Sequence, residues 1–374
     1  MLVHFTTVHP RTDTRIHIKQ VRTLAKNWPG EILLFVQDGK GDELHSEQGY
    51  EIRDTGPAES GRFRRMSFGA WRMYRAVKSA KPIIAHFHDP ELLPWAFLLQ
   101  LQGVKVVYDV HENAPATVLS KAYLNPFIRR PIALILHGLE RAAKAIFSAV
   151  IAATIDIRDN FGAGTVLVQN FPILSELHQP NHTKYSERPK DFAYVGGITS
   201  IRSVHEIVDA LEELGRSDVR LQMAGAFIPE SLEAEVTPKE GWSHVRFYGW
   251  AGRDAVSDIM ANVRAGLVLF HPLPNHMKSQ PNKLFEYMSA GLPVIASDFP
   301  FWREFVREAG TGLLVDPKNS LAIAEAMQWI LDHPAEAEAM GQRGRQAVEC
   351  CYNWDTEAVK LIALYEELLN SKKG

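Results

Sequence analysis

Short apolar runs alternate with helical patterns along this chain, and this alternation constrains the fold more than any other feature of the sequence. Runs rich in β-branched residues indicate buried strands, and apolar residues spaced by three and four indicate amphipathic helices. The predicted strands are 2–7, 31–36, 83–88, 104–109, 150–153, 166–169, 192–195, 220–224, 245–248, 265–270, 294–297 and 312–315. The predicted helices are 17–27, 68–80, 91–102, 127–147, 157–161, 204–214, 254–262, 282–289, 302–307, 321–331, 335–350 and 356–369. Strands that alternate with helices form parallel sheets, so we expect an α/β protein.

The length and the linker signals predict two domains. A chain of 374 residues has room for two domains of ordinary size. The segment 171–190 is polar, contains three prolines and has no periodicity, as is typical of a linker. We therefore expect one α/β domain over 1–170, a second over 191–353, and a cleft between them.

Charge and cysteine content argue against several classes of protein. Residues 1–170 hold 21 basic and 16 acidic side chains, and the remainder hold 20 and 28, so the halves are expected to meet different partners. The net charge of −3 and the lack of a recognition motif argue against nucleic acid binding. The two cysteines, Cys350 and Cys351, are adjacent, and the sequence shows no secretory signal. Because no apolar run approaches the ~20 residues of a membrane span, we expect a cytoplasmic protein.

The most informative motif is Pro281–Pro300, which predicts a helix, a stop at Gly291 and a buried strand. Pro281 is expected in the first helical turn, where proline has no amide hydrogen to satisfy. Ligands of open α/β sheets bind at the carboxyl ends of strands, beside helix N-termini that attract phosphate. Lys283 and Glu286 lie one turn apart on this helix. A cation for phosphate and a carboxylate for ribose suit a nucleotide-diphosphate sugar, and an ordinary solvated ion pair is the alternative.

A glycine pair follows the predicted strand 192–195 and precedes a helix start. Gly196 and Gly197 allow a ligand to approach the backbone closely, and the amides that follow can hold an anion. Arg202 would lie at the same opening and could bind a diphosphate with two hydrogen bonds. The alternative is a tight turn with a surface arginine.

Polar side chains end two predicted strands of the first half. His86 and His88 alternate along one strand and therefore point to one sheet face, and Asp89 follows them. The next strand ends with Asp109 and His111. Polar strand ends are the usual location of an α/β active site. Two alternatives are histidines that hydrogen-bond at buried strand ends and the start of a zinc site. No third ligand motif is evident, so we expect no metal.

The loop after the first predicted strand is charged rather than rich in glycine. It contains Asp13 and Arg15, which favours a sugar or acceptor contact over a dinucleotide site. The alternative is a helix cap, with Asp13 or Thr14 capping a helix that begins at Ile16.

The segment 62–81 has seven basic residues, no acidic residue and interleaved aromatic side chains. Such a segment could rest on anionic lipid headgroups. The alternative is an amphipathic surface helix that packs its apolar residues inward.

With these residues, the chain resembles the GT-B glycosyltransferases of the family 4 type. The resemblance is strongest over 192–317, and it rests on Tyr194-Val-Gly-Gly with Arg202, on the segment 282–297 and on Gly310–Pro317.

Three motifs of the first half resemble a bacterial subgroup that makes surface polysaccharide. They are Asp13-Thr-Arg-Ile, His88-Asp-Pro-Glu-Leu-Leu-Pro and Tyr108-Asp-Val-His-Glu. The resemblance implies two Rossmann-like domains with parallel sheets, of which the first binds the acceptor and the second the nucleotide sugar. It also implies that a C-terminal helix within 354–374 packs back on the first domain. The family transfers sugar with retained configuration and without a metal, so no cofactor is expected.

The resemblance also implies roles for single residues. Arg202 matches one cation of the family's phosphate clamp, and Gly197 stands where the other is usual, so Lys283 is expected to replace it. Glu286 matches the glutamate that binds ribose. Lys278 stands where a second glutamate usually contacts the donor sugar. His111 matches a histidine near the reaction centre.

The expected catalytic residues are therefore His111, Arg202 and Lys283. The expected substrate-binding residues are Gly196, Gly197, Glu286, Asn282, Asp13, Arg15, His88 and Asp89. The donor is expected to be a UDP- or GDP-linked sugar, and the acceptor a carbohydrate or a lipid-linked molecule. The alternatives are a nucleotide-sugar epimerase or hydrolase of the same fold, a zinc-dependent hydrolase, and a catalytically weak nucleotide-binding partner in a polysaccharide assembly complex.

Overall fold

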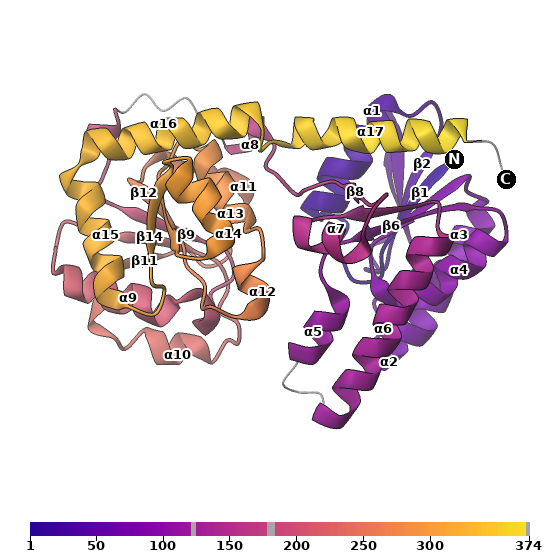
Figure 1. The fold of residues 1–374 in the computed structure, drawn as a ribbon, viewed down its shortest axis with the longest axis horizontal. Coiled ribbons are helices and arrows are strands. Elements are labelled where there is room, and N and C mark those ends of the chain that lie inside the picture. Colours follow the sequence, from indigo (N-terminus) through magenta and orange to yellow (C-terminus); the bar gives the residue numbers. More distant parts are fainter. Residues whose placement is uncertain (121–124, 178–183, 372–374) are drawn as a thin grey trace. The chain divides into compact units, whose positions relative to one another are not determined.

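The computed structural model describes residues 1–120, 125–177 and 184–371. The chain divides into two compact units (Figure 1). One unit comprises Met1–Asn170 and Asp355–Gly374, and the other comprises Phe171–Trp354. Each unit is an α/β domain built around its own sheet, so the predicted fold class is confirmed.

The first unit contains an eight-stranded sheet of order β3-β4-β2-β1-β5-β6-β7-β8. Its strands are β1 (Leu2–Phe5), β2 (Ile32–Val36), β3 (Glu43–His45), β4 (Tyr50–Asp54), β5 (Ile84–Phe87), β6 (Lys105–Val110), β7 (Ala149–Ala152) and β8 (Val166–Leu167). Neighbouring strands are parallel except β3 and β4, which pair antiparallel at one edge. The expectation of a fully parallel sheet is wrong at this edge. The predicted strands include neither β3 nor β4. β3 is short, and its residues are mostly exposed.

Helices cover the sheet of the first unit because their apolar residues recur on one face. In α3, Met73, Tyr74 and Val77 are buried against the sheet core. The helical segments of this unit are η1 (Thr14–Val21), α1 (Arg22–Asn27), η2 (Ser46–Gln48), α2 (Arg62–Arg64), η3 (Arg65–Gly69), α3 (Ala70–Ala80), η4 (Pro90–Leu92), α4 (Leu93–Leu101), α5 (Ala114–Ser120), α6 (Pro126–Ile146) and α7 (Ile155–Phe161).

The last helix, α17 (Trp354–Asn370), packs on the first unit although it follows the second in sequence. The hydroxyl of Tyr365 lies 2.6 Å from Nδ1 of His86. Oε2 of Glu357 accepts a hydrogen bond of 2.9 Å from the backbone amide of Gln169. Lys105 donates to backbone carbonyls of Leu368 and Ser371. Residues 372–374 of the expected C-terminal helix lie outside the described residues.

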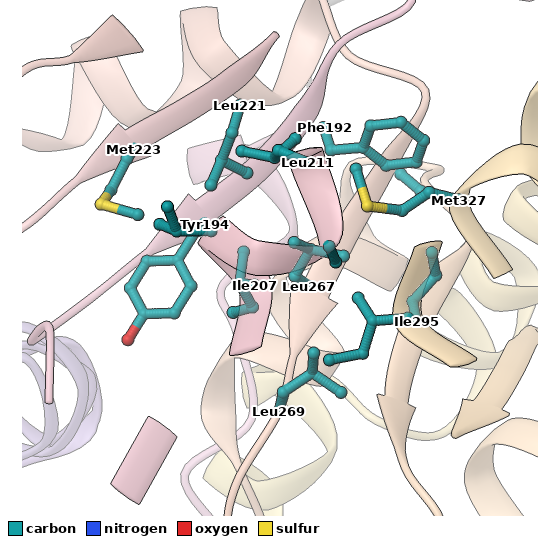
Figure 2. Close-up of a cluster of buried hydrophobic side chains, with 14 of the residues drawn as sticks. Phe192, Tyr194, Ile207, Leu211, Leu221, Met223, Leu267, Leu269, Ile295 and Met327 are labelled. Carbon is teal, nitrogen blue, oxygen red and sulfur yellow. The ribbon is translucent and has the colours of Figure 1, made fainter. Parts of the chain in front are cut away.

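The second unit contains a six-stranded sheet of order β11-β10-β9-β12-β13-β14, and every neighbouring pair is parallel. Its strands are β9 (Phe192–Val195), β10 (Leu221–Ala224), β11 (Val245–Phe247), β12 (Ala265–Val268), β13 (Val294–Ser297) and β14 (Gly312–Val315). Figure 2 shows one side of the core, where side chains of β9, β10 and β12 meet Ile207 and Leu211 of α9. Met327, from α15, packs into the same cluster.

The helical segments of the second unit are α8 (Leu174–Leu177), η5 (Tyr185–Glu187), η6 (Ser200–Arg202), α9 (Val204–Leu214), α10 (Leu232–Val236), η7 (Glu240–His244), α11 (Arg253–Ala261), α12 (Pro274–Met277), α13 (Asn282–Ser289), α14 (Pro300–Arg303), η8 (Glu304–Glu308), α15 (Ser320–Asp332) and α16 (Pro334–Cys350). Across the described ranges, we find no helix with the length and apolar character needed to cross a membrane.

The segment 171–190 was predicted to be a linker, but its described residues belong to the second unit and pack against it. Phe171 is buried against Phe285, with ring centroids 4.9 Å apart. Tyr185 is buried and donates a 2.6 Å hydrogen bond to the carbonyl of Arg264. Residues 178–183 lie outside the described residues.

Candidate functional site

A cavity of about 410 Å³ lies at the carboxyl ends of β9 and β12 in the second unit. The first residues of α13 complete its wall. Its lining residues are Tyr194, Val195, Arg202, Leu267, Val268, Leu269, Phe270, His276, Ser279, Gln280, Pro281, Asn282 and Lys283. The predicted Arg202, Asn282 and Lys283 therefore share one cavity.

Gly196 lies next to the two predicted phosphate cations, Arg202 and Lys283. Its backbone has a φ of +132°, a conformation that residues other than glycine rarely adopt. A Cβ at this position would come within 3.0 Å of Nη1 of Arg202 and 3.8 Å of Cε of Lys283. The guanidinium group of Arg202 and the side chain of Lys283 therefore both border the space beside this backbone. Two cationic side chains next to an open backbone suit the binding of an anion.

The side chain of Arg202 is held in place by two contacts. Its Nη1 donates a 3.2 Å hydrogen bond to the carbonyl of Gly197. Its guanidinium group lies over the ring of Phe270, 5.1 Å from the ring centroid. Gly197 therefore contributes a carbonyl that orients the arginine. Sequence reasoning missed Gly225, which lies against the backbone of Gly196. Any other residue at this position would place its Cβ 1.9 Å from the carbonyl oxygen of Gly196.

Glu286 is buried beneath the cavity wall with both carboxylate oxygens paired. Oε2 accepts from Lys283, so the prediction that these residues share a helix face is confirmed. Oε1 accepts a 3.1 Å hydrogen bond from Arg253, which also donates to Glu176. Burial by itself would raise the pKa of Glu286, but Lys283 and Arg253 outweigh it and hold that pKa below its usual value. Arg253, at the start of α11, carried no signal in the sequence because its partner lies 33 positions away.

The start of α13 differs by one residue from the expectation. Pro281 has φ −78° and ψ 117°, so it precedes the helix instead of forming its first turn. Asn282 is the first helical residue, is exposed and lines the cavity. An amide-rich helix N-terminus next to two cations favours an anionic ligand.

In the first unit, Asp109 is the centre of a buried hydrogen-bond network at the end of β6. Arg15 binds it through two hydrogen bonds, of 3.0 Å from Nε and 2.6 Å from Nη2. Gln20 donates a third of 2.8 Å. Nε2 of His111 lies 2.9 Å and Nδ1 of His88 lies 3.2 Å from Oδ2 of the same carboxylate. Burial alone would raise the pKa of Asp109, but the charge of Arg15 and the two imidazoles hold it well below its usual value.

Within this network, His111 is the group that reaches solvent. Its side chain is 18% exposed, whereas those of Asp109, His88 and Arg15 are exposed by 0%, 0% and 5%. Arg15 was expected to contact substrate, but its side chain is buried and bound to Asp109. His88 likewise lies behind His111.

The other two predicted residues of the first unit, Asp13 and Asp89, accept hydrogen bonds from the segment that follows β1. Oδ1 of Asp13 accepts a 2.8 Å hydrogen bond from the amide of Ile16, so the capping alternative is confirmed for this residue. Asp89 is buried and accepts from the amide of Thr7 at 2.6 Å and from the hydroxyl of Thr6 at 2.8 Å. Both carboxylates therefore shape the backbone near His111.

Three histidines stack beneath this network. His4 pairs with His86 in the strand register, and His88 lies two residues further along the same face. The ring planes of His86 and His88 are inclined by only 26°, and those of His4 and His88 by 20°. Nδ1 of His4 lies 3.3 Å from Nε2 of His88. His86 and His88 are thus buried histidines that form hydrogen bonds at the ends of strands, which is one of the alternatives predicted from the sequence.

The expectation that a third potential metal ligand is missing is wrong. His4, His86 and His88 form one group whose ligand atoms lie within 4.8 Å of one another, and His88, Asp109 and His111 form another. His4 was missed because its partner strand lies more than 80 residues away. In the second group, each pair of ligand atoms is already within hydrogen-bond distance, 2.9 to 3.3 Å.

The buried histidines predict that acid destabilises the protein. Burial lowers the pKa of His88 to about 3, and that of His4 and His86 well below 6.5. As the pH falls below 6.5, the unfolded chain takes up protons that the folded protein does not, so the free energy of unfolding should decrease. Urea unfolding measured between about pH 7 and about pH 5 would reveal the slope. Proton uptake in the folded protein by Glu140, whose pKa burial raises to about 7, offsets only part of the effect of the three histidines. An unfolding free energy that is constant over this interval would contradict the prediction.

Two family models match the chain. The model described as Glycosyltransferase Family 4 matches residues 19–164, and the model described as Glycosyl transferases group 1 matches residues 177–347.

Curated relatives share low sequence identity over most of the chain. Glycogen synthase of Mycobacterium tuberculosis is 23% identical over 309 residues, covering 79% of this chain and 71% of the relative. D-rhamnosyltransferase WbpZ of Pseudomonas aeruginosa is 26% identical over 286 residues, covering 74% of this chain and 71% of the relative.

Solved structures share the fold over nearly the whole chain. Sucrose-phosphate synthase of Thermosynechococcus elongatus superposes with a TM-score of 0.77 at 17% identity, covering 98% of both chains. Anabaena HepE in complex with UDP-glucose superposes with a TM-score of 0.73 at 13% identity, covering 98% of this chain and 99% of the other.

Proposed function

This chain belongs to the GT-B glycosyltransferases of the family 4 type, and we propose that it moves a sugar from a nucleotide-diphosphate sugar to a carbohydrate or lipid-linked acceptor. The donor binds in the cavity of the second unit, and the acceptor binds to the first. Transfer retains the configuration of the sugar and needs neither a metal nor a cofactor.

The observation that carries this proposal is that the side chains of Arg202 and Lys283 both lie next to the backbone of Gly196. When the bond between a sugar and a diphosphate breaks, negative charge grows on the leaving oxygen. Two fixed cations and the N-terminus of α13 can stabilise that charge, and they need no reorganisation during the reaction. A diphosphate in this cavity would therefore gain most stabilisation in the transition state.

In the first unit, His111 is the member of the Asp109 network that reaches solvent, so it is the side chain proposed to contact the reacting sugar. The carboxylate of Asp109 fixes the orientation of the imidazole, and Arg15 fixes that carboxylate. His111 is thus proposed as a catalytic residue that orients the donor sugar or acceptor, with Asp109 and Arg15 as positioning residues.

The relatives support the donor and acceptor classes. Anabaena HepE forms complexes with UDP and UDP-glucose, which supports a nucleotide-linked donor. The names of WbpZ and of an Escherichia coli O-antigen chain mannosyltransferase, 26% identical over 187 residues, support a role in bacterial polysaccharide or glycoconjugate synthesis.

A turnover assay with UDP- and GDP-linked sugars, with and without a mixture of glycan and lipid-linked acceptors, tests the proposal. We expect nucleotide release that depends on the acceptor and persists in EDTA. Free sugar without transfer would indicate a hydrolase, and an epimerised donor would indicate an epimerase. Nucleotide binding without any turnover would favour a non-catalytic assembly partner, and loss of activity in EDTA would favour the zinc alternative.

Removal of Glu286 is expected to weaken nucleotide binding. In Glu286→Ala, Lys283 and Arg253 lose their shared anchor, and the proposed ribose hydrogen bond is lost. We expect the affinity for UDP or GDP to fall by about 1–3 kcal/mol, measured by calorimetry. Glu233→Ala, which removes an exposed carboxylate on α10, serves as the control. Equal affinities for the two variants would argue against a role of Glu286 in binding.

We also propose that the segment 62–81 contacts an anionic membrane surface. Phe63 and Phe68 are 83% and 62% exposed, whereas Met73 and Val77 pack inward, so the segment has both an inner and an outer apolar face. Sedimentation with vesicles containing phosphatidylglycerol should recover the protein, and the double variant Phe63→Ser, Phe68→Ser should stay in the supernatant. Leu44→Ser, at another exposed apolar residue of this unit, is the matched control. Equal sedimentation of all three proteins would refute the contact.

A further inference from the structure

The first unit contains a second cavity, of about 500 Å³, that none of the roles above involves. It lies among the start of α5, the second half of α6 and the end of α7. Its lining residues are Asn113, Pro115, His137, Glu140, Arg141, Lys144, Ile157, Asn160, Phe161 and Gly162. The volume is in the range of small-molecule sites. Asn113 is two residues beyond His111 in the chain, although His111 itself does not line the cavity.

Glu140 is a buried acid without a partner in this cavity. The residue is 7% exposed, and its Oε1 has no hydrogen-bond partner among residues 1–120, 125–177 and 184–371. Desolvation raises the pKa of its carboxyl group to about 7. Lys144 lies one turn further along α6, yet no ion pair joins the two side chains in the described structure. A buried carboxyl group is costly unless something hydrogen-bonds to it, and a ligand rich in hydroxyl groups would supply those donors.

Basic side chains stand at the same cavity without acidic partners. Arg141 and Lys144 line it and form no ion pair with any residue that the structure describes, and His137 lies one turn before Arg141. A Cβ at Gly164 would come within 3.5 Å of Nζ of Lys144, so the ammonium group sits over the turn that ends α7. Two cations that no carboxylate neutralises favour a ligand with a strong negative charge, such as phosphate.

We propose that this cavity binds the acceptor as a sugar phosphate. Hydroxyl groups of the sugar donate hydrogen bonds to the carboxyl group of Glu140, and phosphate oxygens accept hydrogen bonds from Arg141 and Lys144. The assignment of this ligand as the acceptor rests on the proposed transferase function. The sugar phosphate could be a soluble metabolite or the head group of a lipid carrier, since both present the same chemistry.

Calorimetry on the full chain saturated with UDP tests this inference, because UDP occupies the donor cavity and leaves the second cavity open. Glucose 1-phosphate is the soluble probe, and a polyprenyl-phosphate-linked glucose in detergent micelles is the lipid probe. Glucose has the hydroxyl groups but no phosphate, and inorganic phosphate has no sugar. Each should therefore bind more weakly than glucose 1-phosphate. The double variant Arg141→Ala, Lys144→Ala should bind the preferred probe about tenfold or more weakly with unchanged affinity for UDP. Arg130→Ala, at an exposed position of the same helix, should match the parent protein.

Each outcome decides the inference. Binding of either probe with the stated dependence on Arg141 and Lys144 supports it, and the probe that binds identifies the soluble or the lipid source. Failure of both probes to bind, or binding that is unaffected by the double variant, overturns it. If UDP binds but neither probe does, the inference fails while the proposed function stands. If a probe binds through Arg141 and Lys144 but neither UDP nor GDP binds the second unit, the cavity is a sugar phosphate site and the proposed function fails.

Discussion

Replacing Asp109 with asparagine is expected to destabilise the protein by about 3–5 kcal/mol, because the substitution leaves the buried guanidinium group of Arg15 without a counter-charge. Arg15 is 5% exposed and Asp109 is completely buried, so solvent cannot compensate for the loss. The same substitution replaces one carboxylate oxygen by an amide NH2 group and removes the charge, so it weakens the interaction that orients His111. Urea unfolding of the full chain would measure the first effect, and the turnover assay the second.

A matched control for this prediction is Asp218→Asn. Asp218 also forms two hydrogen bonds with an arginine, at 3.0 Å each from Nε and Nη2 of Arg216, but the two side chains are 48% and 26% exposed. Exposed ion pairs contribute little to stability because solvent screens them, so this variant should unfold close to the parent protein. If both substitutions had the same small effect, burial would not be what makes the Asp109 network important.

Replacing Lys283 with methionine is expected to lower the rate of sugar transfer by about 10²–10³-fold, which is the usual effect of removing one group that stabilises transition-state charge. Cε of Lys283 and Nη1 of Arg202 both lie close to the position that a Cβ of Gly196 would occupy, at 3.8 Å and 3.0 Å, and the leaving diphosphate is proposed to sit beside them. The rate should fall more than the affinity for UDP, because the charge on the leaving oxygen is greatest in the transition state. Measurements of kcat and KM with saturating acceptor would separate the two effects.

Two further variants make this prediction specific. Lys318→Met removes an exposed lysine of the same unit that does not line the cavity, and it should transfer sugar at the parent rate. Lys283→Arg keeps the charge and should recover part of the rate. A Lys283→Met enzyme with a rate within a few-fold of the parent would show that this lysine serves only to pair with Glu286.

Several parts of the fold and the donor site could be predicted from the sequence because they depend on neighbours in the chain. The bounds of α9, α13, β13 and β14 match the predicted ranges, since each has a strong apolar pattern and a clear stop. The ion pair between Lys283 and Glu286 follows from helix geometry alone. The position of Pro281 differs from the prediction, because the residue before a helix and the first residue within it share similar preferences.

The partners of the buried charges were decided by the tertiary structure. Arg15 and Asp109 are 94 positions apart, and Arg253 and Glu286 are 33 apart, so no local pattern could pair them. The contact between the rings of His4 and His86 depends on the register between β1 and β5, and that register is set by the packing of the whole sheet.

The sequence by itself thus determined an α/β chain with an anion-binding helix start, because periodicity and helix geometry act over a few residues. The tertiary structure alone decided that Arg15 binds Asp109 instead of facing solvent. It also decided that Oε1 of Glu140 is buried in the cavity of Arg141 and Lys144, with no hydrogen-bond partner among the residues that the structure describes. The physical reason is that the cost of burying a charge depends on which distant groups surround it, and only the folded chain brings those groups together.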